Sequence, residues 1–410
     1  MRSSGLAVIT AIALNALAVL PVAASDPPWN RTGPVKVIFD TDMYGDIDDA
    51  LALAMLHALE SRGEIELLAV TISTETEWAA RFVELINTFY GRGGIPVGVV
   101  SGGVTPQVLE DSRYGKYLPS PNGINYTEYI ARDAPAVRDH EDAATLLRRV
   151  LARQPDQSVV MIGVGYLSNL ARLLDSQPDG ASPSDGRVLV GQKVKVLSVM
   201  AGNFAATGVQ EFNLELDVPA ARKVFGQWPT PIVVSGSEVG ARMLFPQSAI
   251  DRYFNYVDHH PVAETYRYAA SFYRSLSKTP GSPHDHATYD LTSVLYAARP
   301  EAGYFTLSAA GTVEVLEGGR SGFTPRERGR HRRLLLPEAQ QARALEAMIM
   351  LASQPPTRQV TATKYCRQRK RAPADAGAPC RVADQRVLTT CSPQSPARSA
   401  APASWQCGTC

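Results

Sequence analysis

Cysteine is missing from the first 365 residues of this 410-residue chain: all five cysteines lie between Cys366 and Cys410. The main body therefore has to fold without disulfides. An odd number of cysteines leaves at least one thiol unpaired or intermolecular if the chain is exported. The terminal sequence "CGTC" has CxxC spacing, but no second pair or histidine partner accompanies it, so it predicts a zinc or redox site only weakly.

A strong net charge is also lacking, because the formal charge is only +1. The positive charge is concentrated after Arg358, which leaves a mildly acidic body without the basic footprint of a nucleic-acid-binding protein. From about Pro355 onward the composition is rich in Pro, Ala, Ser, Arg and Gln and shows no periodicity. We therefore expect residues 356–410 to form a flexible, basic, cysteine-containing tail.

Only one apolar run is long enough to span a bilayer, and it lies at the N-terminus. Arg2 precedes an apolar stretch from Leu6 to Val22, and the small residues "VAA" stand before Ser25. This pattern predicts a signal peptide over residues 1–24, with an uncleaved signal anchor as the alternative. We expect a secreted or periplasmic protein with no stable membrane insertion after cleavage.

The body shows the alternation of strands and helices that is typical of an α/β protein. Near-continuous apolar runs such as "VKVIF", "IELLAVTI", "SVVMIGVG" and "VKVLSVMAG" alternate with helical patterns. Such runs predict a mostly parallel central sheet with helices on both faces, in one domain of about residues 30–350. "GYFTLS" and "TVEVLE" predict a closing antiparallel pair of strands, which would form a small antiparallel extension near the C-terminus. Ligand chemistry is then expected at the carboxyl ends of the strands.

The stretch "VIFDTDMYGDIDDALALAML" places an unusual number of carboxylates between a strand and a helix. It holds Asp40, Asp42, Asp46, Asp48 and Asp49. Anions this close repel one another, so a shared cation is a physical reason for them to coexist.

Two common motifs explain this stretch poorly. An EF-hand loop beginning at Asp40 would place Leu51 at the obligatory glutamate position, and no helix precedes it, so that interpretation fails. "DTDMY" offers the two aspartates of a haloacid dehalogenase-type phosphatase, although Tyr44 does not fit that motif. The phosphatase remains a weaker alternative.

Four segments in order carry a more specific similarity. "DTDMYGDIDDALALAML", "VGYLSNLARLL", "QEFNLELDVPAARKVF" and "YDLTSVLYA" span much of the body. Together they resemble the inosine-uridine-preferring nucleoside hydrolase family. The resemblance implies a nucleoside hydrolase-like, Rossmann-like fold and a calcium-dependent hydrolysis of the N-glycosidic bond of small-molecule ribonucleosides to free base and ribose.

The resemblance also implies roles for individual residues. Ca²⁺ would be held by Asp42, Asp49, Asp290 and the backbone carbonyl of Val164. Asp48 would be the base that activates the attacking water. The substrate-binding residues would be Glu211, Asn213, Asn203 and Tyr289, with Glu211 and Asn213 on the ribose hydroxyls.

Several positions depart from the family pattern. Tyr289 stands where the best-known members have a histidine as the proposed leaving-group acid, and a phenol with a pKa near 10 is a weak acid for that task. Ala205 replaces a usual asparagine, which Asn203 can supply after a local shift, and Ser73 replaces another. Base preference, the leaving-group acid and the oligomeric state, including a homo-oligomer, stay open. A non-catalytic ribose- or nucleoside-binding protein on the same fold is the alternative.

A few further residues are left undecided by the sequence. The turn before Asp48 is two residues longer than in the best-known members and contains Asp46, which fits either the surface or the surroundings of the site. "HDHATYD" can bring His284 or His286 to the mouth of the site, and "SGSEVG" can bring Glu238 there. Asp40 is expected to order the loop rather than to touch substrate.

Overall fold

A computed structural model describes residues 33–43, 46–111, 139–205, 209–276 and 284–357 of the chain. The predicted signal peptide and almost all of the predicted tail lie outside these residues. Helix α14 (Glu338–Ala352) runs past residue 350, and its last residue, Ala352, is fully buried. The packed body therefore continues to at least the end of this helix.

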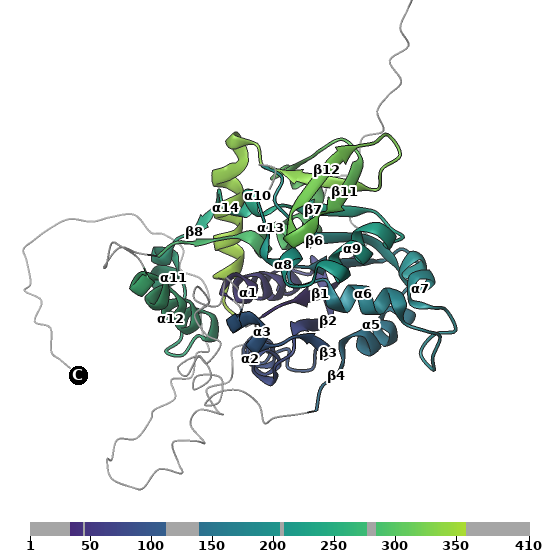
Figure 1. The fold of residues 1–410 in the computed structure, drawn as a ribbon. Coiled ribbons are helices and arrows are strands. Elements are labelled where there is room, and N and C mark those ends of the chain that lie inside the picture. Colours follow the sequence, from purple (N-terminus) through teal and green to yellow (C-terminus); the bar gives the residue numbers. More distant parts are fainter. Residues whose placement is uncertain (1–32, 44–45, 112–138, 206–208, 277–283, 358–410) are drawn as a thin grey trace, which may run out of the picture. The chain divides into compact units, whose positions relative to one another are not determined.

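One sheet organises the described part of the chain (Figure 1). Eleven strands belong to it, in the order β12-β11-β13-β7-β6-β5-β1-β2-β3-β4, with β10 paired to β13. The strands are β1 (Val35–Thr41), β2 (Ile65–Thr74), β3 (Val97–Val104), β4 (Glu141–Asp142), β5 (Val159–Gly163), β6 (Val194–Met200), β7 (Ile232–Ser235), β10 (Thr306–Leu307), β11 (Gly311–Val315), β12 (Ser321–Pro325) and β13 (His331–Leu335). All pairs from β4 through β7 to β13 are parallel, which confirms the predicted fold class.

The antiparallel extension is present, but its predicted pairing is wrong. β11, from "TVEVLE", pairs with β12, whereas β10, from "GYFTLS", pairs with β13. β12 and β13 contain Gly, Pro and several Arg residues and lack the apolar alternation that identifies a strand in a sequence.

Helices cover both faces of the sheet and bury two separate apolar layers. One layer contains residues of α1 (Asp48–Ser61), α2 (Glu77–Phe89), α12 (Pro261–Leu276), α13 (Tyr289–Ala298) and α14. The other contains residues of α5 (Ala143–Ala152), α6 (Ser168–Asp175), α7 (Gly186–Lys193) and α9 (Val218–Gln227). Successive side chains of β1 alternate between the two layers: Val37 and Phe39 enter the first, and Ile38 enters the second.

Local sequence signals explain where several of these helices begin. Asp142, Asp185 and Asp217 are the N-caps of α5, α7 and α9, and each side chain accepts a hydrogen bond from a backbone N–H of the first turn. Short elements connect the larger ones. They are α3 (Pro106–Asp111), α8 (Phe212–Glu215), α10 (Ser237–Gly240), β8 (Leu244–Phe245), α11 (Gln247–Tyr253), β9 (His286–Ala287), η3 (Pro300–Ala302) and η4 (Glu317–Gly319).

The order of the strands places a crevice beside β1. β1 has β2 on one side and β5 on the other, so the chain leaves β1 in one direction and returns on the opposite side. At such a switch point the loops after neighbouring parallel strands diverge and leave room for a ligand. The aspartate-rich segment follows β1 directly.

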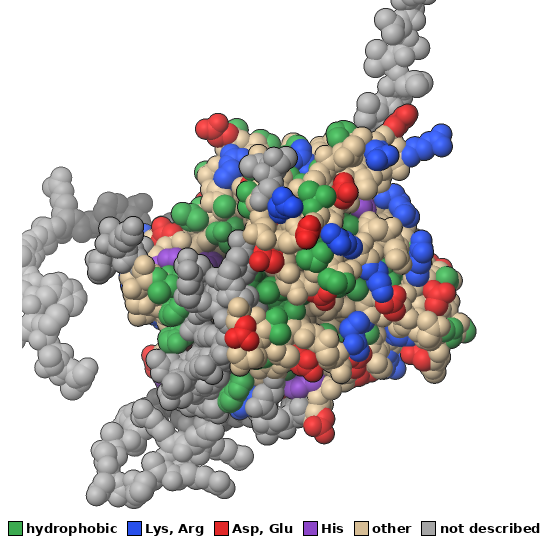
Figure 2. Space-filling view, in the orientation of Figure 1, with side chains coloured by type: hydrophobic (Ala, Val, Ile, Leu, Met, Phe, Trp, Pro, Cys, Tyr) green, Lys and Arg blue, Asp and Glu red, His purple; other side chains and the backbone are tan. Residues whose placement is uncertain are grey.

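The surface shown in Figure 2 carries acidic and basic side chains interspersed over the described residues. Within the described ranges, no helix combines the length and apolar character needed to cross a membrane.

The packing of α14 against α1 leads to a stability prediction. Leu351 is 1% exposed and belongs to the core layer that contains α1, so Leu351→Ala should lower the free energy of unfolding by about 2–4 kcal/mol. Met350 on the same helix is 58% exposed, and Met350→Ala should change it by less than about 0.5 kcal/mol. Urea unfolding of both variants measures the difference. Equal effects would show that α14 is not held as described.

Candidate active site

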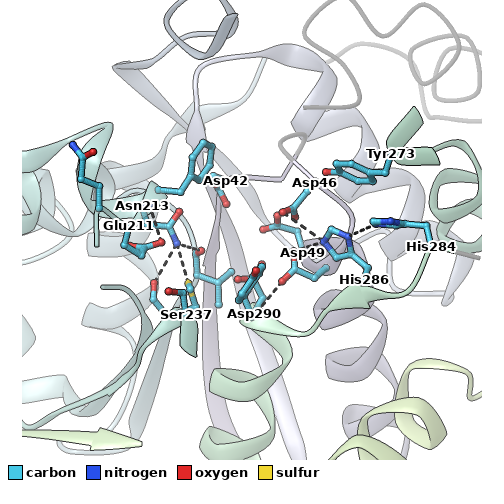
Figure 3. Close-up of a pocket in the computed structure, with 16 residues that line it drawn as sticks. Asp42, Asp46, Asp49, Glu211, Asn213, Ser237, Tyr273, His284, His286 and Asp290 are labelled. Carbon is cyan, nitrogen blue, oxygen red and sulfur yellow. Dashed lines mark hydrogen bonds and ion pairs between the residues drawn. The ribbon is translucent and has the colours of Figure 1, made fainter. Parts of the chain in front are cut away.

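A pocket of about 370 Å³ opens at the carboxyl ends of the central strands (Figure 3). Asp42 follows β1, Val164 follows β5, and Met200 ends β6, and all three line the pocket. Asp48 and Asp49 reach it from the first turn of α1, and Asp290 reaches it from the first turn of α13. The structure thus brings residues from distant parts of the chain to the predicted edge of the sheet.

Three of these carboxylates form a compact group. One oxygen from each of Asp48, Asp49 and Asp290 lies within 4.8 Å of the others, and all three residues are at most 5% exposed. Burial, and then the neighbouring carboxylates, raise the pKa of Asp49 and Asp290 well above the usual value. A cation among the three carboxylates would offset both the cost of burying their charges and their mutual repulsion.

Neighbouring hydrogen bonds orient the group. The backbone N–H of Asp290 donates to Oδ2 of Asp48 over 3.1 Å, and the hydroxyl of Thr41 donates to the Asp49 carboxylate. Asp48 and Asp49 occupy the first turn of α1, where the helix dipole favours negative charge.

The predicted ligands Asp42 and Val164 line the same pocket. Asp42 is 5% exposed, and burial followed by the charges of Asp46 and Asp48 raises its pKa well above the usual value. The carbonyl of Val164 accepts a hydrogen bond of 2.7 Å from Nδ2 of Asn213, which fixes its direction and leaves its second lone pair. Together with Asp49 and Asp290 these groups offer only oxygen donors. Such a set fits a hard divalent cation of the calcium or magnesium type.

Glu211 and Asn213 line the pocket, and both are tied to the backbone around it. Glu211 caps the short helix α8: its carboxylate accepts hydrogen bonds from the backbone N–H groups of Gly202, Asn213 and Leu214. Burial raises the pKa of Glu211 to about 7, although these bonds partly oppose the shift. Oε2 accepts two of these bonds and Oε1 accepts one, so Oε1 keeps acceptor capacity toward a ligand hydroxyl.

Asn203, which was predicted to bind substrate, is separated from the pocket by another side chain. It is not among the described residues that line the pocket, and its amide donates to Oγ of Ser237 over 2.8 Å. Ser237 does line the pocket, so Asn203 reaches it only through this partner. Glu238 is likewise outside the lining and accepts a hydrogen bond from the backbone of Phe204. The substrate-binding role of Asn203 stays a prediction.

Asp40 lies outside the pocket lining, in agreement with its expected role in ordering the loop. It is fully buried and accepts hydrogen bonds from Thr71 Oγ1 at 2.5 Å and Asn169 Nδ2 at 2.7 Å. Burial raises its pKa to about 7 despite these two bonds. It therefore joins β1, β2 and α6 beneath the site.

Asp46, left undecided by the sequence, lies in the pocket opposite a histidine. Nε2 of His286 is 3.6 Å from Oδ2 of Asp46 and 3.7 Å from Oδ1 of Asp48. Burial opposes a charge on His286, but the two carboxylates outweigh it and raise its pKa to about 10. Nδ1 of His286 lies 3.3 Å from Nε2 of His284, whose ring stacks on Tyr273. Both histidines line the pocket.

The sequence profile of the inosine-uridine preferring nucleoside hydrolases matches residues 37–364. The chain belongs to this family. The match includes all the acidic residues of the pocket, and the phosphatase alternative has no support from it. The profile also extends into the first residues of the predicted tail.

Individual relatives are distant. The inosine-uridine preferring nucleoside hydrolase of Crithidia fasciculata is 26% identical over 207 residues, which are 49% of this chain and 60% of that protein. The pyrimidine-specific ribonucleoside hydrolase RihA of an Enterobacter strain is 27% identical over 274 residues, or 65% of this chain and 80% of RihA. The aligned region thus spans less than two thirds of the Crithidia protein.

Solved structures support the fold. A plant nucleoside hydrolase, PpNRh1, has a TM-score of 0.60 at 19% identity, covering 78% of this chain and all of that one. A purine-preferring ribonucleoside hydrolase from Gardnerella vaginalis has a TM-score of 0.57 at 17% identity, covering 78% and 98%. The nucleoside hydrolase-like α/β fold predicted from the four motifs is confirmed.

Tyr289, the position that departs from the family pattern, lies on the pocket wall at the start of α13. Burial, and then the charges of Asp48 and Asp46, raise its pKa to about 12. The phenol is therefore protonated near neutral pH and can donate a hydrogen bond. It is an even weaker acid than the sequence alone indicates.

Sequence reasoning missed several other lining residues, among them Phe212, Ser237 and Tyr273. Tyr273 comes from the last turn of α12, and its only signal was the aromatic content of that helix. Phe212 lies inside the quoted "QEFN" motif, but binding roles were inferred only for its polar neighbours Glu211 and Asn213.

A glycine behind the metal-ligand candidates gives a prediction for the site. A Cβ on Gly165 would lie 2.3 Å from the backbone nitrogen of Asp42 and 2.6 Å from Oγ of Ser73. Because backbone must move, Gly165→Ala should lower the free energy of unfolding by about 1–3 kcal/mol and weaken the binding of a divalent cation by displacing Asp42.

Gly163→Ala is the matched control, since its Cβ would meet Leu170 Cδ1 at 3.4 Å, an ordinary contact. Thermal unfolding with and without Ca²⁺ measures both variants. A Gly165→Ala protein that binds Ca²⁺ as well as the control would contradict the close approach of Gly165 to Asp42.

Proposed function

We propose that the protein hydrolyses the N-glycosidic bond of ribonucleosides to free base and ribose, with Ca²⁺ as its metal. The observation that carries this proposal is the buried group of Asp48, Asp49 and Asp290 in the same pocket as Glu211, in a chain of the nucleoside hydrolase family. A volume of about 370 Å³ lies in the range of small-ligand sites.

Asp42, Asp49, Asp290 and the Val164 carbonyl would hold the cation. When bound, it supplies positive charge that orients and acidifies the attacking water. Asp48 is the base that takes the proton from this water. Its neighbours support this role, because burial and then the charge of Asp46 raise the pKa of Asp48 well above the usual value and make it a better proton acceptor.

The remaining carboxylates act on the ribose. Hydrolysis builds positive charge on the sugar ring as the base departs, and fixed negative charge in a dry pocket stabilises that charge. Glu211 and Asn213 are held by backbone contacts and face the pocket, so they bind ribose hydroxyls in a fixed direction. Tyr289 provides an aromatic face and a phenol O–H on the side of the base.

A non-catalytic nucleoside-binding protein is the second candidate, and the protonated, weakly acidic Tyr289 is the observation that favours it. Turnover distinguishes the two candidates. A binder would gain thermal stability with a nucleoside, without release of free base.

For the parts of the chain outside the described residues, we propose that residues 1–24 direct export, to the periplasm or out of the cell. The basic tail after residue 356 is proposed to be dispensable for folding of the body. These proposals rest on the sequence pattern alone.

The first test concerns the metal and the base. Chelation, or Asp49→Ala, should abolish hydrolysis and lower the melting temperature, because a ligand that favours the native state is lost. Asp48→Asn should keep Ca²⁺ binding in calorimetry while turnover falls by about 10²–10⁴-fold. Normal turnover of Asp48→Asn would mean that another residue is the base, and full activity after exhaustive chelation would overturn the metal assignment.

The second test concerns the sugar. A site that hydrogen-bonds a hydroxyl rejects an analogue without it strongly, by about 10⁴-fold, because its buried polar groups are left unpaired. Inosine should therefore be cleaved far faster than 2′-deoxyinosine, whereas inosine and uridine should differ less. The release of free base measures all three rates. Comparable rates for the first pair would show that Glu211 and the metal ligands do not hold the 2′ hydroxyl.

A further inference from the structure

We propose that Asp46, Asp48 and His286 form a second divalent-cation site in the same pocket, which takes a first-row transition metal such as Co²⁺ or Zn²⁺. This site is chemically distinct from the all-oxygen group because it contains an imidazole nitrogen. The proposal concerns metal binding and does not require that the protein hydrolyse nucleosides.

The first support is the spacing of the three ligand atoms, which all lie within 4.8 Å of one another. Nε2 of His286 stands 3.6 and 3.7 Å from carboxylate oxygens of Asp46 and Asp48, which is too long for a hydrogen bond. Two ligands bound to a tetrahedral ion at about 2.1 Å are roughly 3.4 Å apart. The observed separations therefore suit an ion between the groups better than direct contact.

The second support is an unsatisfied nitrogen. The side chain of His286 is 8% exposed, and its Nε2 makes no hydrogen bond within the described residues. A buried polar atom without a partner is costly, so it indicates a ligand that the protein alone does not supply. Figure 3 shows the ring directed at the aspartates.

The other side of the imidazole has the arrangement that orients metal-binding histidines. Nδ1 of His286 pairs with Nε2 of His284 over 3.3 Å, and the His284 ring stacks on Tyr273 with centroids 4.5 Å apart. When Nδ1–H donates to His284, the lone pair of Nε2 is free to bind a metal. A hydrogen bond of this kind to the far nitrogen fixes both the tautomer and the direction of the ring.

Asp48 connects this site to the oxygen-only group. Its Oδ1 faces His286, while its Oδ2 accepts the backbone N–H of Asp290. Two carboxylates and an imidazole favour first-row transition metals, whereas oxygen donors alone favour calcium or magnesium. One pocket thus offers two donor sets of different metal preference, and Asp48 lies between them.

The test is calorimetric titration of the full chain with Co²⁺ in excess Ca²⁺. The wild type should bind one more equivalent of Co²⁺ than His286→Gln, and Asp46→Asn should bind that equivalent at least about 10-fold more weakly. His259→Gln is the matched control, because His259 is a half-exposed histidine paired with Glu264 away from the pocket. The cysteines are the same in all four proteins, so any cobalt on thiolates cancels in the comparison.

Equal Co²⁺ stoichiometry and affinity in all four proteins would overturn the proposal and leave a proton as the occupant between His286 and the aspartates. If His286→Gln fails to fold, Asp46→Asn decides, because Asp46 is 30% exposed and tolerates substitution better. Hydrolysis of inosine in Ca²⁺ alone is assayed in parallel. If the wild type binds no more Co²⁺ than His286→Gln while hydrolysis is intact, only this proposal is rejected. If the wild type binds the additional Co²⁺ without hydrolysing inosine, only the proposed function is rejected.

Discussion

Electrostatic repulsion among buried carboxylates is the constraint on which the rest of this structure depends. Asp42, Asp48, Asp49 and Asp290 are each at most 5% exposed, and burial together with mutual charge raises the pKa of all four. Such a group destabilises the native state unless something positive offsets it. The chain keeps it in place through the first turn of α1, the end of β1 and the first turn of α13. The site is therefore built at an energetic cost that a ligand can recover.

The parts of the fold that the sequence predicted are those with strong periodicity. β1, β2, β5 and β6 are near-continuous apolar runs, and α1 and α2 follow them with helical spacing. Buried parallel strands appear in a sequence as near-continuous apolar runs because both of their faces are covered. β12 is the edge strand and β13 lies between β11 and β7, and the identity of both depends on pairing with other strands rather than on their own residues. The predicted antiparallel pair failed for that reason.

The site was predictable to the extent that its residues lie in contiguous motifs. Asp42, Asp48 and Asp49 share one segment, and Asp290 lies in another motif of the same family, so their convergence followed from the resemblance and the strand order. The contact between Asp46 and His286 was not predictable, because it joins an extended turn to a segment of low sequence signal. Asn203 differs for a local reason: its amide is used by Ser237. Hydrogen-bond partners of this kind depend on side-chain geometry that spacing does not contain.

The hydrogen bond from the backbone of Asp290 to Asp48 spans 242 residues of sequence. Contacts of such separation form late in folding, because the entropy of closing the intervening loop has to be overcome first. During synthesis, the segment around Asp48 emerges from the ribosome long before its partner exists. A nascent or prematurely ended chain that stops before Asp290 lacks a complete set of carboxylates. The timing of translation thus keeps unfinished chains without the metal site, and catalytic competence arrives only when nearly the whole body has been made.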